Sequence, residues 1–217
     1  MTEADWLACH DHSAMITFLK GQGVDSYRKY RLLLVAYCRT FLPELLVDEQ
    51  TRHVIEVAEG YADESVDKTE LARAKRLALK TVEKRLRLEF AVRSVTHGLP
   101  MREAIDFPYF CLRPWRGSNY NRPTPSQRRM LGQLIRDIFG NPFRPVGLDP
   151  AWLTWHDGLL VFMARQIYDS RDFADMPVLA DALEEAGCTD SSILGHLRGP
   201  GPHVRGCWVI DLLIGKE

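Results

Sequence analysis

The sequence predicts a mainly α-helical protein: a multi-helix orthogonal bundle with one long loop rich in proline, arginine and aromatic residues. Apolar residues recur three and four positions apart through most of the 217 residues, which is the period of an amphipathic helix. Capping residues, prolines and glycines divide these stretches at intervals typical of helices. We expect a single helical domain over residues 1–217, with an N-terminal helical region (residues 1–98), a loop (residues 99–125) and a C-terminal helical region (residues 126–217).

The N-terminal region contains several short helical patterns followed by a long one. Their expected starts and ends are caps at Thr2 and Ser13, a stop at Gly21, a cap at Asp25, a stop at Pro43 and a cap at Asp48. The long helix is expected over residues 69–97 and is closed by Gly98. Its predicted buried stripe is Leu71, Ala74, Ala78, Val82, Leu86 and Phe90.

The loop and the C-terminal region are defined mainly by proline. Prolines at 100, 108, 114, 123 and 125 argue against a regular helix in 99–125. Cap-plus-proline pairs at Thr124-Pro125 and Asp149-Pro150 indicate helix starts. Further helices are expected over residues 126–140, 158–168, 177–186 and 190–197. The apolar ending 207–214 fits a helix or a buried strand, and its i, i+4 spacing favours the helix.

Composition excludes several classes of protein. The net charge is −1, so no overall field indicates a nucleic acid or an anionic membrane. No apolar run approaches the ~20 residues that cross a bilayer, and the start MTEADW is acidic where a secretory signal is basic and then apolar. The five cysteines are scattered without CxxC spacing, as in reduced cytoplasmic proteins. We therefore expect a cytoplasmic protein without membrane contact.

The segment 195–208, GHLRGPGPHVRGCW, concentrates glycine, proline and chemically active side chains. His196, His203 and Cys207 offer imidazole and thiolate, which suit zinc. A thiol activated by a neighbouring imidazole is a second interpretation of the same residues, as in a small histidine- and cysteine-dependent enzyme. The alternative is structural: the histidines bond open carbonyls and Cys207 packs in the core.

A line of cations runs along the expected long helix. Its members, spaced three and four apart, are Arg73, Arg76, Lys80, Lys84 and Arg87. Such a line can neutralise phosphates and would bind nucleic acid. The preceding segment 44–67 is strongly acidic, so we favour an antiparallel helical hairpin with complementary flanks or a solvated face, and do not expect nucleic acid to be the partner.

The loop 99–125 carries Trp115, Arg116, Tyr120 and Arg122, residue types enriched at interface hot spots. The alternative is a loop packed onto the helices. Together with His203, Arg205 and Trp208 of the C-terminal segment, these residues form our candidate surface for a protein partner. The function we favour is a non-enzymatic interaction or adaptor module. The metal-binding protein or small enzyme comes second, and nucleic-acid binding comes third.

Several segments resemble a family of bacterial proteins. The similar segments are the start MTEADWLAC (1–9), 57–63, 134–145, 148–153, 177–188 and the ending RGPGPHVRGCWVIDLLIGKE (198–217). No activity is established for that family, so the resemblance implies no catalytic residue and no cofactor.

Overall fold

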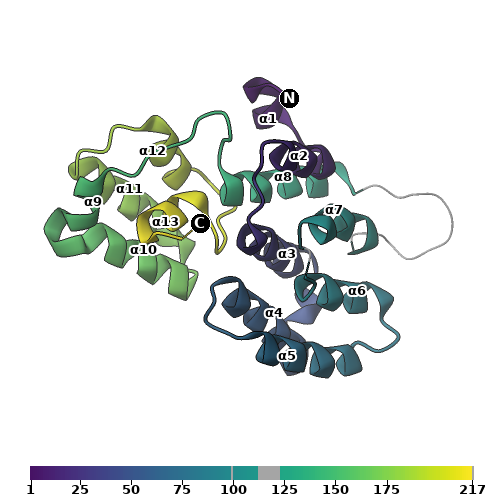
Figure 1. The fold of residues 1–217 in the computed structure, drawn as a ribbon. Coiled ribbons are helices and arrows are strands. Elements are labelled where there is room, and N and C mark those ends of the chain that lie inside the picture. Colours follow the sequence, from purple (N-terminus) through teal and green to yellow (C-terminus); the bar gives the residue numbers. More distant parts are fainter. Residues whose placement is uncertain (99, 112–122, 217) are drawn as a thin grey trace. The chain divides into compact units, whose positions relative to one another are not determined.

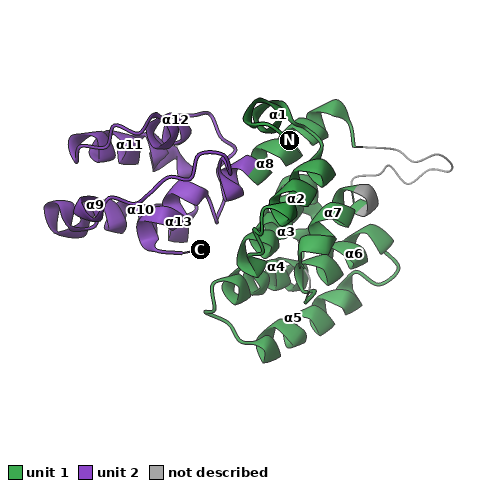
Figure 2. Cartoon of the chain, turned by 45° about the horizontal axis from the view of Figure 1, so that its top comes forward, with its two compact units in different colours: residues 1–135 green, residues 136–217 purple. Residues whose placement is uncertain are grey.

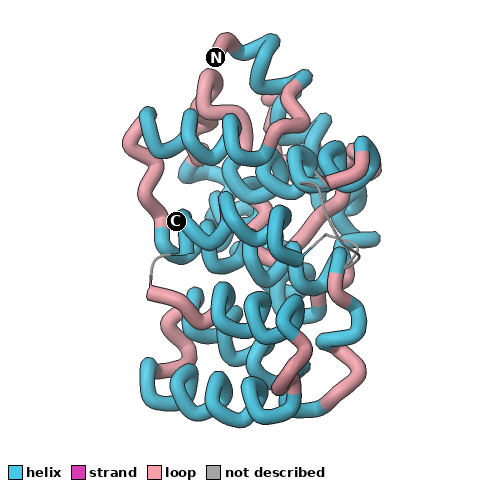
Figure 3. The backbone as a smooth tube through the Cα atoms, turned by 90° about the vertical axis from the view of Figure 1, so that its right-hand side faces the viewer, coloured by secondary structure: helices cyan, strands magenta, loops and turns pink. Residues whose placement is uncertain are grey.

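The computed structural model describes residues 1–98, 100–111 and 123–216, with the backbone alone at 109 and 110. Helices joined by turns and irregular segments make up this described portion of the chain, and no β-strand occurs in it (Figure 3). The predicted mainly α-helical class is confirmed. The chain divides into two compact units, residues 1–135 and 136–217 (Figure 2). A single domain with one shared core stays a prediction.

Unit 1 is organised around α3 (Tyr27–Phe41), in which every residue from 30 to 38 is buried. A helix that is buried on all sides must be covered by neighbours, and α3 packs against three other helices of this unit, α4, α6 and α7. The other α-helices, labelled in Figure 1, are α1 (Glu3–Ala8), α2 (His12–Gly21), α4 (Glu49–Ala62), α5 (Lys68–Thr81), α6 (Leu86–Val95), α7 (Pro100–Cys111) and α8 (Pro125–Phe139), the last of which continues into unit 2. A short 3₁₀ helix, η1 (Pro43–Leu45), lies between α3 and α4.

The long helix expected over 69–97 is wrong, because the chain breaks between α5 and α6. Lys84 adopts a left-handed φ of 66° in the break. The predicted stripe continues through Val82, which is fully buried, but its next member, Leu86, is 59% exposed. The buried positions resume at Leu88 and Ala91. This change of phase cannot be accommodated on one face of a straight helix.

The expected α4–α5 hairpin is present. These helices pack against each other along their lengths, and His53 Nε2 of α4 lies 3.4 Å from Glu70 Oε1 of α5. The charged contacts of Arg52 and Arg73 are made within one helix, to Glu56 and Glu70. The hairpin is therefore held by its apolar faces more than by charge pairs between the two helices.

The loop expected over 99–125 is wrong in its first portion, where α7 forms. Pro100 starts this helix, a position at which its missing N–H costs nothing. Pro108 lies near the end of the helix, so it removes a hydrogen bond only in the last turns. Ala104, Phe107 and Cys111 are fully buried at helical spacing. Burial of that face outweighs the proline penalty.

Unit 2 has its own apolar core. Its helix α10 (Leu159–Ser170) packs against α11 (Met176–Glu185) and α13 (Trp208–Ile214), and α12 (Ser191–Leu197) packs against α11 and α13. Shorter elements α9 (Pro150–Thr154), η2 (Trp155–Gly158) and η3 (Phe173–Asp175) connect them. The helices expected in this region, including the helical ending, are confirmed. No helix among the described residues has the length and apolar character needed to span a membrane.

Candidate metal centre

An aspartate lies on the buried face of α8, where an apolar residue would be expected. Asp137 follows Leu134 by three positions and precedes Ile138, both fully buried. The Asp137 side chain is itself only 2% exposed. Burying a carboxylate is costly unless charged or hydrogen-bonding groups compensate it. The groups around Asp137 therefore determine what this position can do.

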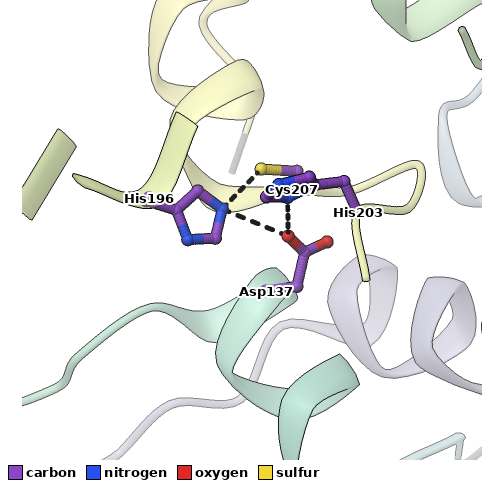
Figure 4. A group of neighbouring side chains, drawn as sticks. All are labelled: Asp137, His196, His203 and Cys207. Carbon is purple, nitrogen blue, oxygen red and sulfur yellow. Dashed lines mark hydrogen bonds and ion pairs between the residues drawn. The ribbon is translucent and has the colours of Figure 1, made fainter. Parts of the chain in front are cut away.

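Three further side chains of unit 2 converge on Asp137 (Figure 4). His196 lies in the last turn of α12, His203 lies in the loop that follows, and Cys207 occupies the N-cap of α13. One ligand atom from each of the four residues lies within 4.8 Å of the others. Cys207 is fully buried, and the side chains of His203 and His196 are 8% and 19% exposed.

The individual distances are short. His196 Nε2 lies 3.1 Å from Cys207 Sγ and 3.1 Å from Asp137 Oδ1. His203 Nδ1 lies 2.8 Å from the same Asp137 Oδ1. Ligands around a tetrahedral zinc ion lie roughly 3.3–3.6 Å apart, given bond lengths near 2.0–2.3 Å. A bound tetrahedral ion thus requires these three pairs of atoms to separate by about half an ångström. The ligand atoms that lie further apart, up to 4.8 Å, have to move closer together.

Outer groups hold the four side chains in these positions. The Val204 N–H donates to Asp137 Oδ2 at 2.9 Å, which leaves Oδ1 directed at the cluster. His203 Nε2 lies 3.3 Å from the Gly199 carbonyl oxygen, to which it can donate a hydrogen bond. Nδ1, which faces Asp137 Oδ1, would be the ligand atom when a metal ion takes the place of the proton between them. Metal-binding histidines in proteins typically donate their second ring N–H in this way.

The electrostatics of the cluster affect the thiol most. Burial raises the pKa of Cys207 well above its ordinary value, and the nearby Asp137 carboxylate raises it further, while the N–H groups of Ile210 and Val209 oppose the change. For His203, burial lowers the pKa, but bonding to Asp137 outweighs it, so the pKa is raised overall. A cation at the centre would favour the thiolate instead.

The geometry does not fit a catalytic cysteine triad. In such a triad the histidine contacts the nucleophile and the carboxylate through its two different nitrogens. Here His196 presents the same atom, Nε2, to both Cys207 and Asp137. One nitrogen that faces both groups fits a three-centre hydrogen bond or a ligand directed at a common metal ion, and does not fit the relay of a triad.

Trp208 covers one side of the cluster. Its ring centroid lies 5.3 Å from that of His196. Its indole also lies against Gly140, at the end of α8, which has a φ of 68°. A Cβ added to Gly140 would lie 3.2 Å from Trp208 Cγ. Glycine is therefore required there both by its backbone and by the close approach of the indole.

The structure brings together the predicted metal ligands His196, His203 and Cys207 and adds Asp137. Trp208 lies beside them, while the guanidinium of Arg205 lies over the Tyr168 ring, 4.4 Å from its centroid. The other residues proposed for a partner surface, Trp115, Arg116, Tyr120 and Arg122, lie outside the described residues. The interaction surface thus stays a prediction.

The cation line proposed for nucleic acid does not form one stripe. Arg73, Arg76 and Lys80 lie on α5, Lys84 lies in the break and Arg87 lies on α6. All five are exposed, and Arg87 forms an ion pair with Glu44. The regular spacing in the sequence therefore does not correspond to a continuous helical face.

Asp137 was missed at the sequence level, although a signal was present. The run Leu134-Ile-Arg-Asp-Ile138 places the carboxylate in phase with the apolar positions of its helix. Its partners lie more than fifty positions further along the chain, so the pattern alone does not connect them.

Comparison with protein-family models, with curated proteins and with solved structures finds no match.

Proposed function

We propose that unit 2 is a metal-stabilised helical module that holds a zinc ion through Asp137, His196, His203 and Cys207. The observation that carries the proposal is the convergence of four different ligand atoms within 4.8 Å of one another in a mostly buried position. Four protein ligands are the usual complement of a tetrahedral zinc ion.

The donor set favours zinc over other common ions. Magnesium and calcium prefer oxygen ligands only, whereas imidazole and thiolate suit zinc. Charge supports the same choice. A carboxylate and a thiolate balance the two positive charges of the ion, so the buried site is neutral when zinc is bound.

A structural role is better supported than a catalytic one. Catalytic zinc sites usually keep one position open for water or substrate, whereas structural sites are closed by four protein ligands. The ligands of this cluster come from α8, α12, the loop after it and α13. A bound ion would join these elements and fix the path of the glycine- and proline-rich loop between residues 199 and 206.

The metal content of the purified full chain tests this proposal. We expect about one zinc per chain by elemental analysis. In the Co²⁺-substituted protein we expect tetrahedral visible bands and a thiolate-to-cobalt charge-transfer band, and Cys207→Ser should abolish the latter. Cys188→Ser is the matched control, because Cys188 is a buried free thiol of the same unit outside the cluster. Zinc that stays bound at full stoichiometry in Cys207→Ser with Asp137→Asn would rule the site out.

A further inference from the structure

A separate pocket lies in unit 1, far along the sequence from the cluster residues. It has a volume of about 400 Å³ and is lined by residues of α3, of α4 and of the segment that follows α4, together with Gly98 after α6. This is within the range of pockets that hold small molecules, roughly 300–1,000 Å³. Its charged and aromatic lining residues indicate what kind of molecule fits.

Arg31 is the unusual member of the lining, because its charge is buried without a counter-ion. It is only 4% exposed. Its guanidinium donates from Nη1 to the Val95 carbonyl oxygen at 2.5 Å and from Nη2 to the His97 carbonyl oxygen at 2.9 Å. It also lies 4.9 Å from the centroid of the Tyr61 ring.

All these partners of Arg31 are neutral. No carboxylate among the described residues forms an ion pair with it. Burial lowers its pKa, yet an arginine side chain keeps its proton in proteins. Carbonyl oxygens take two of the five N–H donors that a guanidinium carries. A buried charge with spare donors at the wall of a pocket favours an anionic ligand.

The neighbouring charges limit the ligand to a single negative charge. Arg28, which also lines the pocket, already pairs with Asp63 at 2.9 Å. Glu64 lies at the pocket as well and is exposed. A dianion such as phosphate would be repelled by this glutamate, and the single uncompensated positive charge of Arg31 would balance only half of its charge. A carboxylate matches both the charge and the planar fork of a guanidinium.

The rest of the lining is suited to an apolar body. Tyr27 and Tyr61 contribute rings, and Ala62 and Val66 contribute aliphatic surface. We propose that this pocket binds a small organic carboxylate, with its charged group on Arg31 and an aromatic or aliphatic body between the tyrosines. This site is independent of the metal centre proposed above.

Phenylacetate titrated into the full chain, followed by amide chemical shifts, tests this assignment. We expect shifts at residues 27–31 and 61–66 and binding about tenfold tighter than that of phenylacetamide, which has the same shape without the charge. Inorganic phosphate should bind more weakly than phenylacetate. Equal binding of the acid and the amide, or shifts confined to other residues, would overturn the proposal.

Variants locate the charged contact. Arg31→Met should reduce phenylacetate affinity about tenfold, and because Arg31 also bonds two carbonyls this variant is checked for folding by its amide spectrum. Tyr27→Ala removes a 54% exposed ring that the fold does not need, and it should weaken binding about threefold in a fully folded protein. Glu64→Gln should leave binding unchanged or tighten it. Unaltered affinity in Tyr27→Ala together with weaker binding in Glu64→Gln would contradict the proposed orientation.

Discussion

His196 Nε2 lies 3.1 Å from Cys207 Sγ, although the two residues are eleven positions apart, one in the last turn of α12 and the other at the N-cap of α13. The contact depends on the loop between α12 and α13, which returns the chain to the end of α12. The same nitrogen also faces Asp137. Convergence of thiol, imidazole and carboxylate on one point is an arrangement that could hold a metal ion.

Removal of the Asp137 charge should weaken metal binding. Asp137→Asn keeps an oxygen that can accept the Val204 N–H and loses the anionic ligand. We expect zinc affinity to fall by more than the ~10–100-fold that loss of an outer-shell partner produces. Competition with a chromophoric chelator measures this. Asp190→Asn is the control, because Asp190 caps α12 outside the cluster and asparagine caps helices as well as aspartate. An equal effect of both substitutions would assign Asp137 a purely structural role.

Chelation should destabilise unit 2 locally. A ligand that binds only the folded state adds about 4 kcal/mol to the free energy of unfolding when its free concentration is ~1,000 times its Kd. We therefore expect faster amide exchange over residues 196–208 after chelator treatment, with α3 of unit 1 little affected. Zinc should restore the protection and magnesium should not. Amide exchange rates over residues 196–208 that are unchanged by the chelator would contradict a structural role for the ion.

The contact between Gly140 and Trp208 should be sensitive to a single methyl group. Gly140→Ala forces alanine into a φ of 68° and places its Cβ 3.2 Å from the indole. We expect it to cost about 2–3 kcal/mol in the free energy of unfolding by urea. Gly187→Ala isolates the backbone contribution, because Gly187 has a φ of 89° with nothing within 4 Å of the added Cβ. A similar loss of unfolding free energy in the two variants would mean that the Trp208 indole moves away from the added methyl group at little cost.

Cys207 should react slowly with alkylating reagents even without metal. Burial and the Asp137 carboxylate raise the pKa of its thiol, and the thiolate is the reactive form. In the chelated protein at neutral pH we expect iodoacetamide to modify the half-exposed Cys9 first, as read by peptide mass spectrometry. Rapid, selective labelling of Cys207 would instead support the thiol-dependent enzyme.

Unit 1 should lose stability as the pH falls below about 6.5, through His12. Burial lowers the pKa of this histidine from 6.5, although its bond to the Ile105 carbonyl and the charge of Asp11 act the other way. The unfolded chain therefore binds more protons than the folded one below that pH, so the stabilisation is present above it and is lost on acidification. Urea unfolding at pH 7.5 and pH 5.5 should show a smaller difference in His12→Gln than in the exposed control His10→Gln. Equal pH dependence in the two variants would exclude His12 as the source.

The sequence predicted those features of the fold that depend on local chemistry. Thr2 and Asp149 cap α1 and α9 as expected, because a side-chain oxygen and the N–H groups two or three residues on are neighbours in any helix start. The helical pattern of the sequence does not predict the break after Val82, because the break depends on how Leu88 and Ala91 pack in the core, which is a tertiary property. The same limit applies to Pro108. The helix-breaking tendency of this proline is outweighed by the burial of Phe107, which is also a tertiary property.

The candidate site was predictable only in part. The spacing of His196, His203 and Cys207 within one unusual segment marked them as chemically relevant. Their fourth partner, Asp137, comes from a helix 66 positions before His203. Spacing in a sequence predicts neighbours on one element, whereas this contact is created by packing between elements.

X-ray absorption at the zinc edge of the purified full chain tests the metal centre most directly. We expect one sulfur at about 2.3 Å from the zinc and three nitrogen or oxygen ligands at about 2.0–2.1 Å, with the sulfur absent in Cys207→Ser. A first shell of six oxygen or nitrogen atoms without sulfur, unchanged by that substitution, would contradict it.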